Sequence, residues 1–200
     1  MKVTKAQVQE NRQRIVETAS VLFRERGYDG VGVADLMAAA GFTHGGFYKH
    51  FGSKADLMAE AAACSFAQSA EKTADVDIAD FVQQYLSRQH RDAPGEGCTM
   101  AALCADAARQ PESLKETFLA GIENQLATLA GKDAALSESA QREARASRIA
   151  TIAQIMGAIV LSRACPDDSP LADEILQVCR SRILNQLAGI NSDTDSYDIN

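Results

Sequence analysis

Apolar side chains recur through most of the chain at the spacing of an amphipathic α-helix. The clearest series near the N-terminus is Ile15, Val16, Ala19, Leu22 and Phe23. Their spacing places these side chains on one face of a helix. Read in the same way, with glycines, prolines and polar clusters as breaks, the whole pattern predicts an all-α fold. The predicted helices cover about residues 5–26, 33–40, 43–50, 53–72, 77–91, 98–110, 111–129, 136–163 and 171–187.

Residues 33–57 describe two short helices on either side of a glycine turn, followed by the start of a third helix. Val33, Leu36 and Met37 give the first short helix an apolar face. Gly41 can adopt the positive φ that closes a tight turn, and Thr43 is a good N-cap for the next helix. That next helix is both aromatic and basic. The arrangement is typical of a helix-turn-helix motif, whose second helix enters the major groove of DNA.

Residues 10–60 resemble the N-terminal DNA-binding domain of the TetR/AcrR family of bacterial transcriptional repressors. The matching signature is Ala40-Gly41-Phe42-Thr43-His44-Gly45-Gly46-Phe47-Tyr48-Lys49-His50-Phe51, followed by Lys54 and Leu57. The first helix and its glycine stop match at Ile15, Ala19, Leu22, Phe23, Gly27 and Tyr28. The sequence departs from the family pattern at Gly32, where a Ser or Thr usually caps the second helix. Glycine is an acceptable N-cap, but it lacks a hydroxyl that could reach a phosphate.

The resemblance implies which residues contact DNA. The predicted set is Gly32, Thr43, His44, Gly45, Tyr48, Lys49, His50 and Lys54. Thr43, His44 and Gly45 would lie nearest the base edges. Tyr48, His50 and Lys54 would hold phosphates, and Lys49 could do either. Independently, a helix N-terminus attracts the phosphate anion and paired glycines let the backbone approach DNA closely. Phe42, Phe47 and Phe51 are expected in the core, and packing is the alternative role for Tyr48.

The second half of the chain resembles, more faintly, the ligand-binding and dimerisation domain of the same family. The similarity lies in residues 97–103 and 157–164. We therefore expect a three-helix DNA-binding domain over residues 1–52 and a larger helical domain for ligand binding and dimerisation over residues 53–190. Residues 191–200 are mostly polar, so a disordered tail is expected there.

Apolar and aromatic residues of the central helices could line an effector pocket. The residues concerned are Phe81, Tyr85, Met100, Leu103, Cys104, Phe118, Ile122 and Ile155. A pocket of this composition would suit a small hydrophobic or aromatic molecule. An ordinary hydrophobic core is the alternative for each of these residues.

The last two predicted helices carry apolar residues beyond one narrow stripe, which indicates a surface in addition to a core face. The predicted dimer interface is Ile152, Ile155, Met156, Ile159, Ile175, Val178 and Ile183. A two-fold dimer would let a helix-turn-helix repressor read the two half-sites of a palindromic operator. Core packing within one subunit is the alternative.

Charge is distributed unevenly along the chain, whose net charge is −7 at pH 7. Residues 1–60 hold eight Lys or Arg and seven Asp or Glu, a net charge of +1, which leaves −8 for residues 61–200. The acidic part would repel DNA while the N-terminal part approaches it.

Few features indicate any other chemistry. The sequence contains no Gly-x-Ser-x-Gly elbow, phosphate-binding loop or dinucleotide-binding glycine pattern, so we expect no enzyme activity and no cofactor. His44 and His50 would point to different helix faces, so no metal site is expected. The five cysteines form no Cys-x-x-Cys pair and are expected to be reduced and mostly buried. Cys98 or Cys104 could instead sense oxidants.

The expected location and function follow from these features together. The N-terminus has no apolar stretch of signal-peptide length, and the longest uncharged stretch, residues 149–162, is shorter than the roughly 20 apolar residues that span a bilayer. We therefore expect a cytoplasmic protein without a membrane partner. The sequence predicts a homodimeric repressor that binds double-stranded operator DNA and is released by an unidentified small apolar or aromatic effector. The alternatives are a thiol-based redox repressor on the same fold and a helical small-molecule-binding protein or enzyme without DNA activity.

Overall fold

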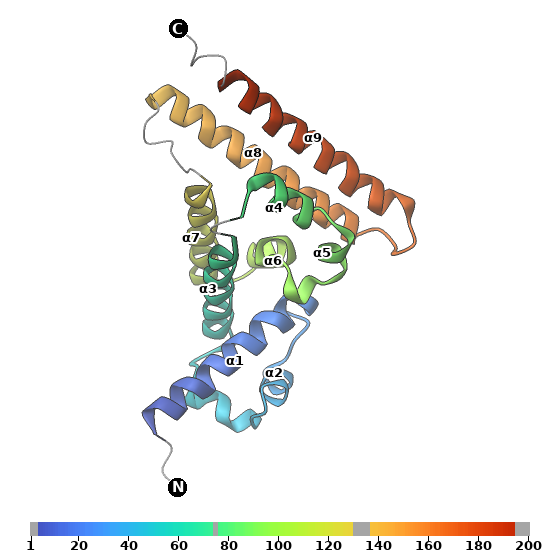
Figure 1. Ribbon diagram of the computed structural model, residues 1–200. Coiled ribbons are helices and arrows are strands. Elements are labelled where there is room, and N and C mark those ends of the chain that lie inside the picture. Colours follow the sequence, from blue (N-terminus) through green and yellow to red (C-terminus); the bar gives the residue numbers. More distant parts are fainter. Residues whose placement is uncertain (1–3, 74–75, 130–136, 195–200) are drawn as a thin grey trace. The chain divides into compact units, whose positions relative to one another are not determined.

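The computed structural model describes residues 4–73, 76–129 and 137–194, and every regular element in these ranges is helical (Figure 1). The elements are α1 (Lys5–Arg26), α2 (Val33–Ala39), η1 (His44–Lys49), α3 (Lys54–Thr73), α4 (Ile78–Tyr85), α5 (Arg88–Asp92), η2 (Pro94–Glu96), α6 (Thr99–Ala107), α7 (Glu112–Thr128), α8 (Glu138–Arg163) and α9 (Pro170–Thr194). Elements η1 and η2 are 3₁₀ helices, and the others are α-helices. The predicted all-α fold is confirmed.

The chain folds as two compact units. The first unit combines Met1–Glu71 with Pro94–Gln125, and the second combines Lys72–Ala93 with Leu126–Asn200. The first unit therefore holds α6 and most of α7 together with the helix-turn-helix elements, while α4, α5, α8 and α9 form the second. The predicted boundary between residues 52 and 53 separates a DNA-binding from a ligand-binding domain. It divides the chain by function, not by packing, and stays a prediction.

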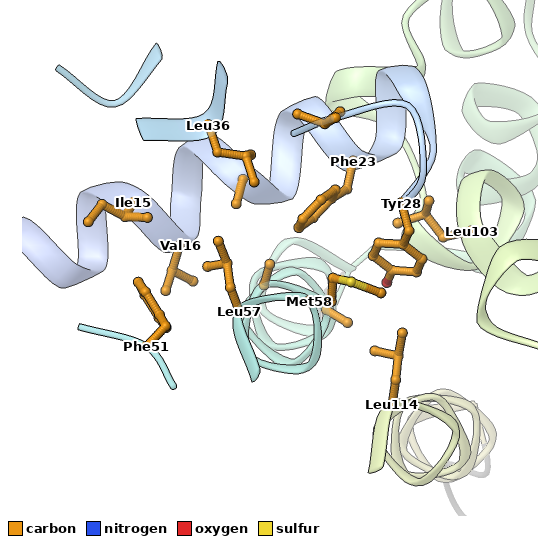
Figure 2. Packing of buried hydrophobic residues seen from close by; sticks show 14 of the residues in the cluster. Ile15, Val16, Phe23, Tyr28, Leu36, Phe51, Leu57, Met58, Leu103 and Leu114 are labelled. Atoms are coloured by element: carbon orange, nitrogen blue, oxygen red, sulfur yellow. The ribbon is translucent and has the colours of Figure 1, made fainter. Parts of the chain in front are cut away.

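An apolar cluster holds the first unit together (Figure 2). Its largest fully buried side chains include Ile15, Phe23, Tyr28, Leu36, Met37, Phe47, Leu57 and Leu114. They come from elements far apart in the sequence, so one core fixes α1, α2, η1, α3 and α7 against one another. Helix α6 adds Leu103 and Ala107 to the same cluster. The rings of Phe23 and Tyr28 meet edge to face, with 5.0 Å between their centroids.

The ends of α1 follow from its sequence. The Thr4 hydroxyl oxygen accepts a hydrogen bond from the Gln7 N–H at 3.2 Å, as an N-cap does. At the other end, Gly27 has a φ of 74° and donates its N–H to the Phe23 carbonyl at 2.8 Å. A positive φ favours glycine, and the predicted glycine stop is confirmed.

The structure divides the helix predicted at residues 77–91 into α4 and α5, so that prediction is wrong at one point. Leu86 leaves the helical conformation, with φ −89° and ψ 51°, and buries its side chain completely. Ser87 then caps α5, because its hydroxyl oxygen accepts a hydrogen bond from the His90 N–H at 3.2 Å. A serine that caps a new helix competes with continuation of the old one.

Two arginines of the second unit cap each other's helices. The Arg91 side chain, which is 3% exposed, donates to the carbonyl and hydroxyl oxygens of Ser162, both at 3.1 Å, and to the Cys165 carbonyl at 3.0 Å. Arg163 in turn donates to the carbonyls of Arg91 and His90, at 2.9 and 2.8 Å. Carbonyl groups at a helix C-terminus have no partner within the helix, so this exchange satisfies both ends and fixes α5 to α8.

We expect Arg91→Ala to lower the free energy of unfolding by about 2–4 kcal/mol, because buried carbonyl and hydroxyl groups lose their donor. Arg88→Ala is the matched control. Arg88 lies on the same short helix and pairs with Asp92 and Asp173, but its side chain is 36% exposed against 3% for Arg91, so its loss should hardly move the unfolding midpoint. Urea unfolding followed by circular dichroism measures both variants. An unchanged midpoint for Arg91→Ala would contradict the capping role.

Helix α9 extends to Thr194, beyond its predicted end near residue 187. The start predicted for the disordered tail, residue 191, is therefore corrected, and residues 195–200 lie outside the described residues. The polar character of this segment did not stop the helix, because adding a residue to an existing helix costs far less than starting one.

Helix α8 is long and apolar enough to cross a membrane by length and composition alone, a criterion that core helices of other proteins also meet. The predicted cytoplasmic location and the predicted lack of a membrane partner stay predictions.

Candidate nucleic-acid interface

The turn between α2 and η1 is closed by Gly41. This glycine has a φ of 84°, and a Cβ on it would meet no atom within 4 Å, so backbone conformation rather than space requires glycine here. The Phe42 N–H then donates to the Met37 carbonyl at 2.8 Å, and the Gly41 N–H donates to the Ala38 carbonyl at 3.0 Å. The predicted glycine turn is confirmed.

Element η1 is a 3₁₀ helix, whereas the sequence predicted an ordinary helix over residues 43–50. Thr43 occupies the N-cap position with φ −83° and ψ 148°, but its side chain makes no capping hydrogen bond. The predicted capping by Thr43 is therefore corrected. Gly45 and Gly46 have low helix propensity, and a 3₁₀ turn suits such a short element.

The apolar residues of η1 and its end anchor it in the core of the first unit. Phe47 is 1% exposed and Phe51 is 3% exposed, with 5.5 Å between their ring centroids. Both were predicted to be core residues, and this is confirmed. Phe42, predicted to be buried as well, is only half-buried, with the Arg14 guanidinium 5.9 Å from the centre of its ring.

Most of the predicted DNA-contacting residues are exposed. The exposed members are Gly32, Thr43, His44, Gly45, Tyr48 and Lys49. Tyr48 is 69% exposed although its ring meets that of Phe47 edge to face at 5.2 Å, so it packs at its base and still presents its hydroxyl to solvent. Gly32 is the N-cap of α2, as the sequence indicated.

His50 and Lys54 are half-buried and make contacts inside the unit. The His50 carbonyl accepts from Arg12 Nε at 3.3 Å, and His50 Nδ1 is buried without a hydrogen-bond partner among the described residues. Lys54 Nζ donates to the Tyr28 carbonyl at 2.5 Å. An ammonium group has three donors, so this bond leaves Lys54 able to hold a phosphate as well.

Sequence reasoning missed Arg12, which supports the end of η1 from α1. Besides its bond to the His50 carbonyl, its guanidinium lies 4.6 Å from the centre of the Phe51 ring and forms an ion pair with Glu60. Arg12 and His50 are 38 residues apart, and helical spacing carries no signal for such a contact.

The residues proposed for the effector pocket are divided between the two units. Met100, Leu103, Cys104, Phe118 and Ile122 belong to the first unit, and Phe81, Tyr85 and Ile155 to the second. Leu103 and Phe118 are 2% and 4% exposed and belong to the core of the first unit, which is the alternative role expected for them. In the second unit, the rings of Tyr85 and His90 are in tilted contact, with 4.3 Å between their centroids, and burial lowers the pKa of that histidine. The pocket stays a prediction.

The structure argues against a redox role for one of the two cysteines proposed as sensors. None of the five cysteines, all of which are described, forms a disulfide. Burial, with a smaller contribution from Cys98, raises the pKa of Cys104 to about 11. Oxidants attack the thiolate, so this shift disfavours Cys104 as a sensor. Cys98 is the N-cap residue of α6, and its proposed redox role stays a prediction.

We expect iodoacetamide to alkylate Cys104 more slowly in the folded protein than in urea, because the raised pKa leaves little thiolate near pH 8. The rate in the folded protein should keep increasing toward pH about 11. Mass spectrometry of the peptide that contains Cys104 measures both rates. Equal rates in the folded and unfolded protein at pH 8 would contradict the assignment.

Part of the predicted dimer interface is buried within the single chain. Ile155, Ile159 and Ile183 are 4%, 0% and 1% exposed, so they pack inside the second unit and are removed from the interface prediction. Ile152, Met156 and Ile175 are half-buried, and Val178 is exposed. Other exposed apolar side chains lie on the same two helices: Ile149, Val160 and Leu161 on α8, and Leu171 on α9. Spacing alone could not separate the two faces, because both are apolar.

Within the described ranges, no group of three or more His, Cys, Asp or Glu residues is arranged to hold a metal ion.

The comparison with known proteins identifies the N-terminal part of the chain. The family model for bacterial regulatory proteins of the tetR family matches residues 15–61. The transcriptional regulator AcrR of Shigella flexneri is 40% identical over 57 residues, which are 28% of this chain and 26% of AcrR. The N-terminal part of the chain, residues 15–61, belongs to the TetR/AcrR family.

Another curated relative aligns over most of the chain. LmrA of Bacillus subtilis is 28% identical over 174 residues, which cover 81% of this chain and 91% of LmrA. The match to AcrR, by contrast, spans about a quarter of that regulator's length. These named relatives are transcriptional regulators, and the expected lack of enzyme activity in this chain stays a prediction.

Solved structures show that the fold of this chain is shared along most of its length. E. coli NemR in its reduced form has a TM-score of 0.69 at 19% identity, over 88% of this chain and 96% of NemR. AibR in complex with isovaleryl coenzyme A and operator DNA has a TM-score of 0.54 at 16% identity, over 86% of this chain and 97% of AibR. At these identities the likeness establishes the fold alone.

Proposed function

We propose that this chain is a DNA-binding transcriptional repressor whose homodimer binds a palindromic operator and is released by a small apolar or aromatic effector. The observation that carries the proposal is the exposure of His44, Tyr48 and Lys49 on an element that Phe47 and Phe51 anchor in the core. Reading DNA requires hydrogen-bonding side chains in a fixed position outside the fold. Membership of the TetR/AcrR family supports the same function.

The exposed residues suit two different parts of DNA, the base edges and the phosphates. Thr43 and His44 can hydrogen-bond to base edges, and Gly45 lets the backbone approach. Tyr48 and Lys49 suit phosphates, which position a protein on the duplex without reading its sequence. The remaining donors of Lys54 would add a phosphate contact at the start of α3.

Exposed apolar residues on α8 and α9 support a homodimer. Val160, Leu161 and Val178 are 48%, 59% and 57% exposed, and apolar patches of this kind mark interaction surfaces. A Cβ on Gly157 would meet nothing within 4 Å, so the surface of α8 is open there for the close approach of another helix. A two-fold dimer would present two copies of η1, the element proposed to read DNA (the reading element), roughly 34–36 Å apart, which is one turn of DNA.

The place of α6 in the first unit supports release by an effector. This helix carries Met100, Leu103 and Cys104 of the proposed pocket and packs in the core that also holds η1. A ligand that displaces α6 would alter the support of the reading element. A coupling of about 1–3 kcal/mol would change operator affinity by up to roughly a hundredfold. AibR, whose solved structure contains both isovaleryl coenzyme A and operator DNA, shares the fold.

The test is to measure binding of purified protein to genomic fragments, including the region upstream of its own coding sequence. We expect a dimer by light scattering and a dissociation constant on the order of 10⁻⁸ M or tighter for one fragment at physiological salt. Affinity should fall steeply as salt increases, because bound phosphates release counterions. A protein that is monomeric and binds none of the fragments at low ionic strength would exclude the proposed function.

A further inference from the structure

The C-terminal turn of α1 is built around a carboxylate from α6. Asp106 Oδ2 accepts a hydrogen bond from the Tyr28 N–H at 3.0 Å. The same oxygen would lie only 2.6 Å from a Cβ placed on Gly27, whose φ is 74°. Glycine at this position therefore serves both the backbone conformation and the close approach of Asp106.

The backbone carbonyl of Tyr28 holds a residue of the proposed DNA interface. Its carbonyl accepts from Lys54 Nζ at 2.5 Å, and Lys54 is the first residue of α3. The Tyr28 side chain is completely buried against Phe23, so the residue cannot move independently of the core. One rigid residue thus connects a carboxylate on α6 with the Lys54 ammonium, through its own N–H and C=O groups.

Helix α6 is packed against Tyr28 as well as hydrogen-bonded to it. Figure 2 shows Leu103 beside the Tyr28 ring, and Leu103 and Ala107, on either side of Asp106 in the sequence, are both buried. A displacement of α6 would therefore move the carboxylate together with the apolar contacts that set its position.

The electrostatic position of Asp106 favours a role beyond stability. The C-terminus of a helix is the negative end of its dipole, where a carboxylate is disfavoured. The ion pair of Asp106 with Arg109, at 2.7 Å, offsets little of this unfavourable interaction because the Arg109 side chain is 65% exposed. The hydrogen bond to Tyr28 is the specific interaction that this placement secures.

We propose that Asp106 is a positioning residue, which couples the location of α6 to the orientation of the Lys54 ammonium through the backbone of Tyr28. When α6 is in place, the Tyr28 carbonyl orders Lys54 for a phosphate. When α6 is displaced, Tyr28 loses both the acceptor of its N–H and the packing of Leu103 against its ring, so its carbonyl turns and Lys54 is no longer held. The inference rests on the proposed DNA binding and adds a residue-level path to it.

A double-mutant cycle tests this path. Asp106→Ala, Lys54→Met and the double variant are titrated with a mixed-sequence DNA duplex of about 30 base pairs at several low salt concentrations, with fluorescence anisotropy as the readout. We expect Asp106→Ala alone to weaken binding by about 5-fold or more, and to change affinity by less than about 2-fold once Lys54→Met is present. The salt slope should decrease by about 1 in each single variant and no further in the double variant.

Two further variants separate positioning from general loss of structure. Asp106→Asn keeps an oxygen that can accept from the Tyr28 N–H and should bind like the wild type. Arg24→Lys alters a second anchor of α1, since Arg24 donates to the Gly95 carbonyl at 2.9 Å and to Ser65, but it does not touch Lys54. Its effect on DNA affinity should be the same with or without Lys54→Met. Unfolding midpoints of all variants are measured in parallel.

Each outcome has a distinct meaning. A wild-type protein that does not bind the duplex excludes the proposed function itself. If the wild type binds, two results overturn the positioning role. One is an equal loss of affinity from Asp106→Ala with and without Lys54→Met, and the other is a loss of affinity in Asp106→Asn. If Asp106→Ala fails to fold, Asp106→Glu replaces it: the longer side chain displaces the acceptor, and a loss of affinity that is independent of Lys54 overturns the proposal.

Discussion

Val178→Asp should produce a folded monomer whose affinity for a two-half-site operator is lower than that of the wild type by about 100- to 10,000-fold. Val178 is 57% exposed in the single chain, so the substitution removes no core contact and should change the stability of the subunit little. In a two-fold dimer the same change occurs on both partners, which places two carboxylates in an apolar contact. Both the association and the second half-site are then lost.

The matched control for this variant is Leu119→Asp. Leu119 is 60% exposed and also lies on a long helix, but on α7 of the first unit rather than on α8 or α9. The Leu119→Asp variant should stay dimeric and bind DNA like the wild type. Light scattering gives the oligomeric state, and anisotropy on one selected genomic fragment gives the affinity. A dimeric Val178→Asp variant with unchanged affinity would move the interface away from the exposed face of α9.

The sequence was sufficient to predict the features that depend on local chemistry. Gly27 and Gly41 were recognised as turn residues, and both have a positive φ. Phe47 and Phe51 were expected in the core, and both are buried. These features are set by a residue's own conformational range or by neighbours within one helical turn, which is the information that spacing carries.

Features that depend on contacts between distant segments were not predictable. The bond between Lys54 and the Tyr28 carbonyl joins residues 26 apart, and that between Asp106 and the Tyr28 N–H joins residues 78 apart. The family resemblance assigns Lys54 to phosphate but gives no sign of its bond to Tyr28, and Asp106 looks like an ordinary exposed charge in the sequence. Only the packing of α1, α3 and α6 into one core brings both groups to the same residue.

The interface prediction included three buried residues for a different reason. Ile159 and Ile183 are completely or almost completely buried, while Val160 and Val178, on the same helices, are about half exposed. A helix that packs within a subunit and also faces a partner is apolar on two sides, so periodicity cannot assign a residue to one side or the other. Burial in the single chain makes this distinction, and it leaves the exposed set as the surface available to a partner.

Tyr48→Ala and His44→Ala should affect DNA binding in different ways. Tyr48 is proposed to hold a phosphate, so its loss should weaken binding by about 10-fold on all sequences, including mixed-sequence duplex. His44 is proposed to lie at base edges, so its loss should mainly reduce the preference for the selected fragment over mixed-sequence DNA. Lys49→Ala should follow one pattern or the other and thereby assign its role.

Lys115→Ala is the control for the loss of one positive charge from the first unit. Lys115 is an exposed lysine on α7 whose ion pair with Glu112 measures 3.4 Å, and it lies outside the proposed interface. Its loss should change affinity little and leave the salt slope unchanged, whereas loss of a phosphate-binding lysine should lower the slope by about 1. If Tyr48→Ala and His44→Ala both bind every duplex as the wild type does, η1 is not the reading element. Phe47 and Phe51, which anchor η1 in the core, would then serve the fold alone.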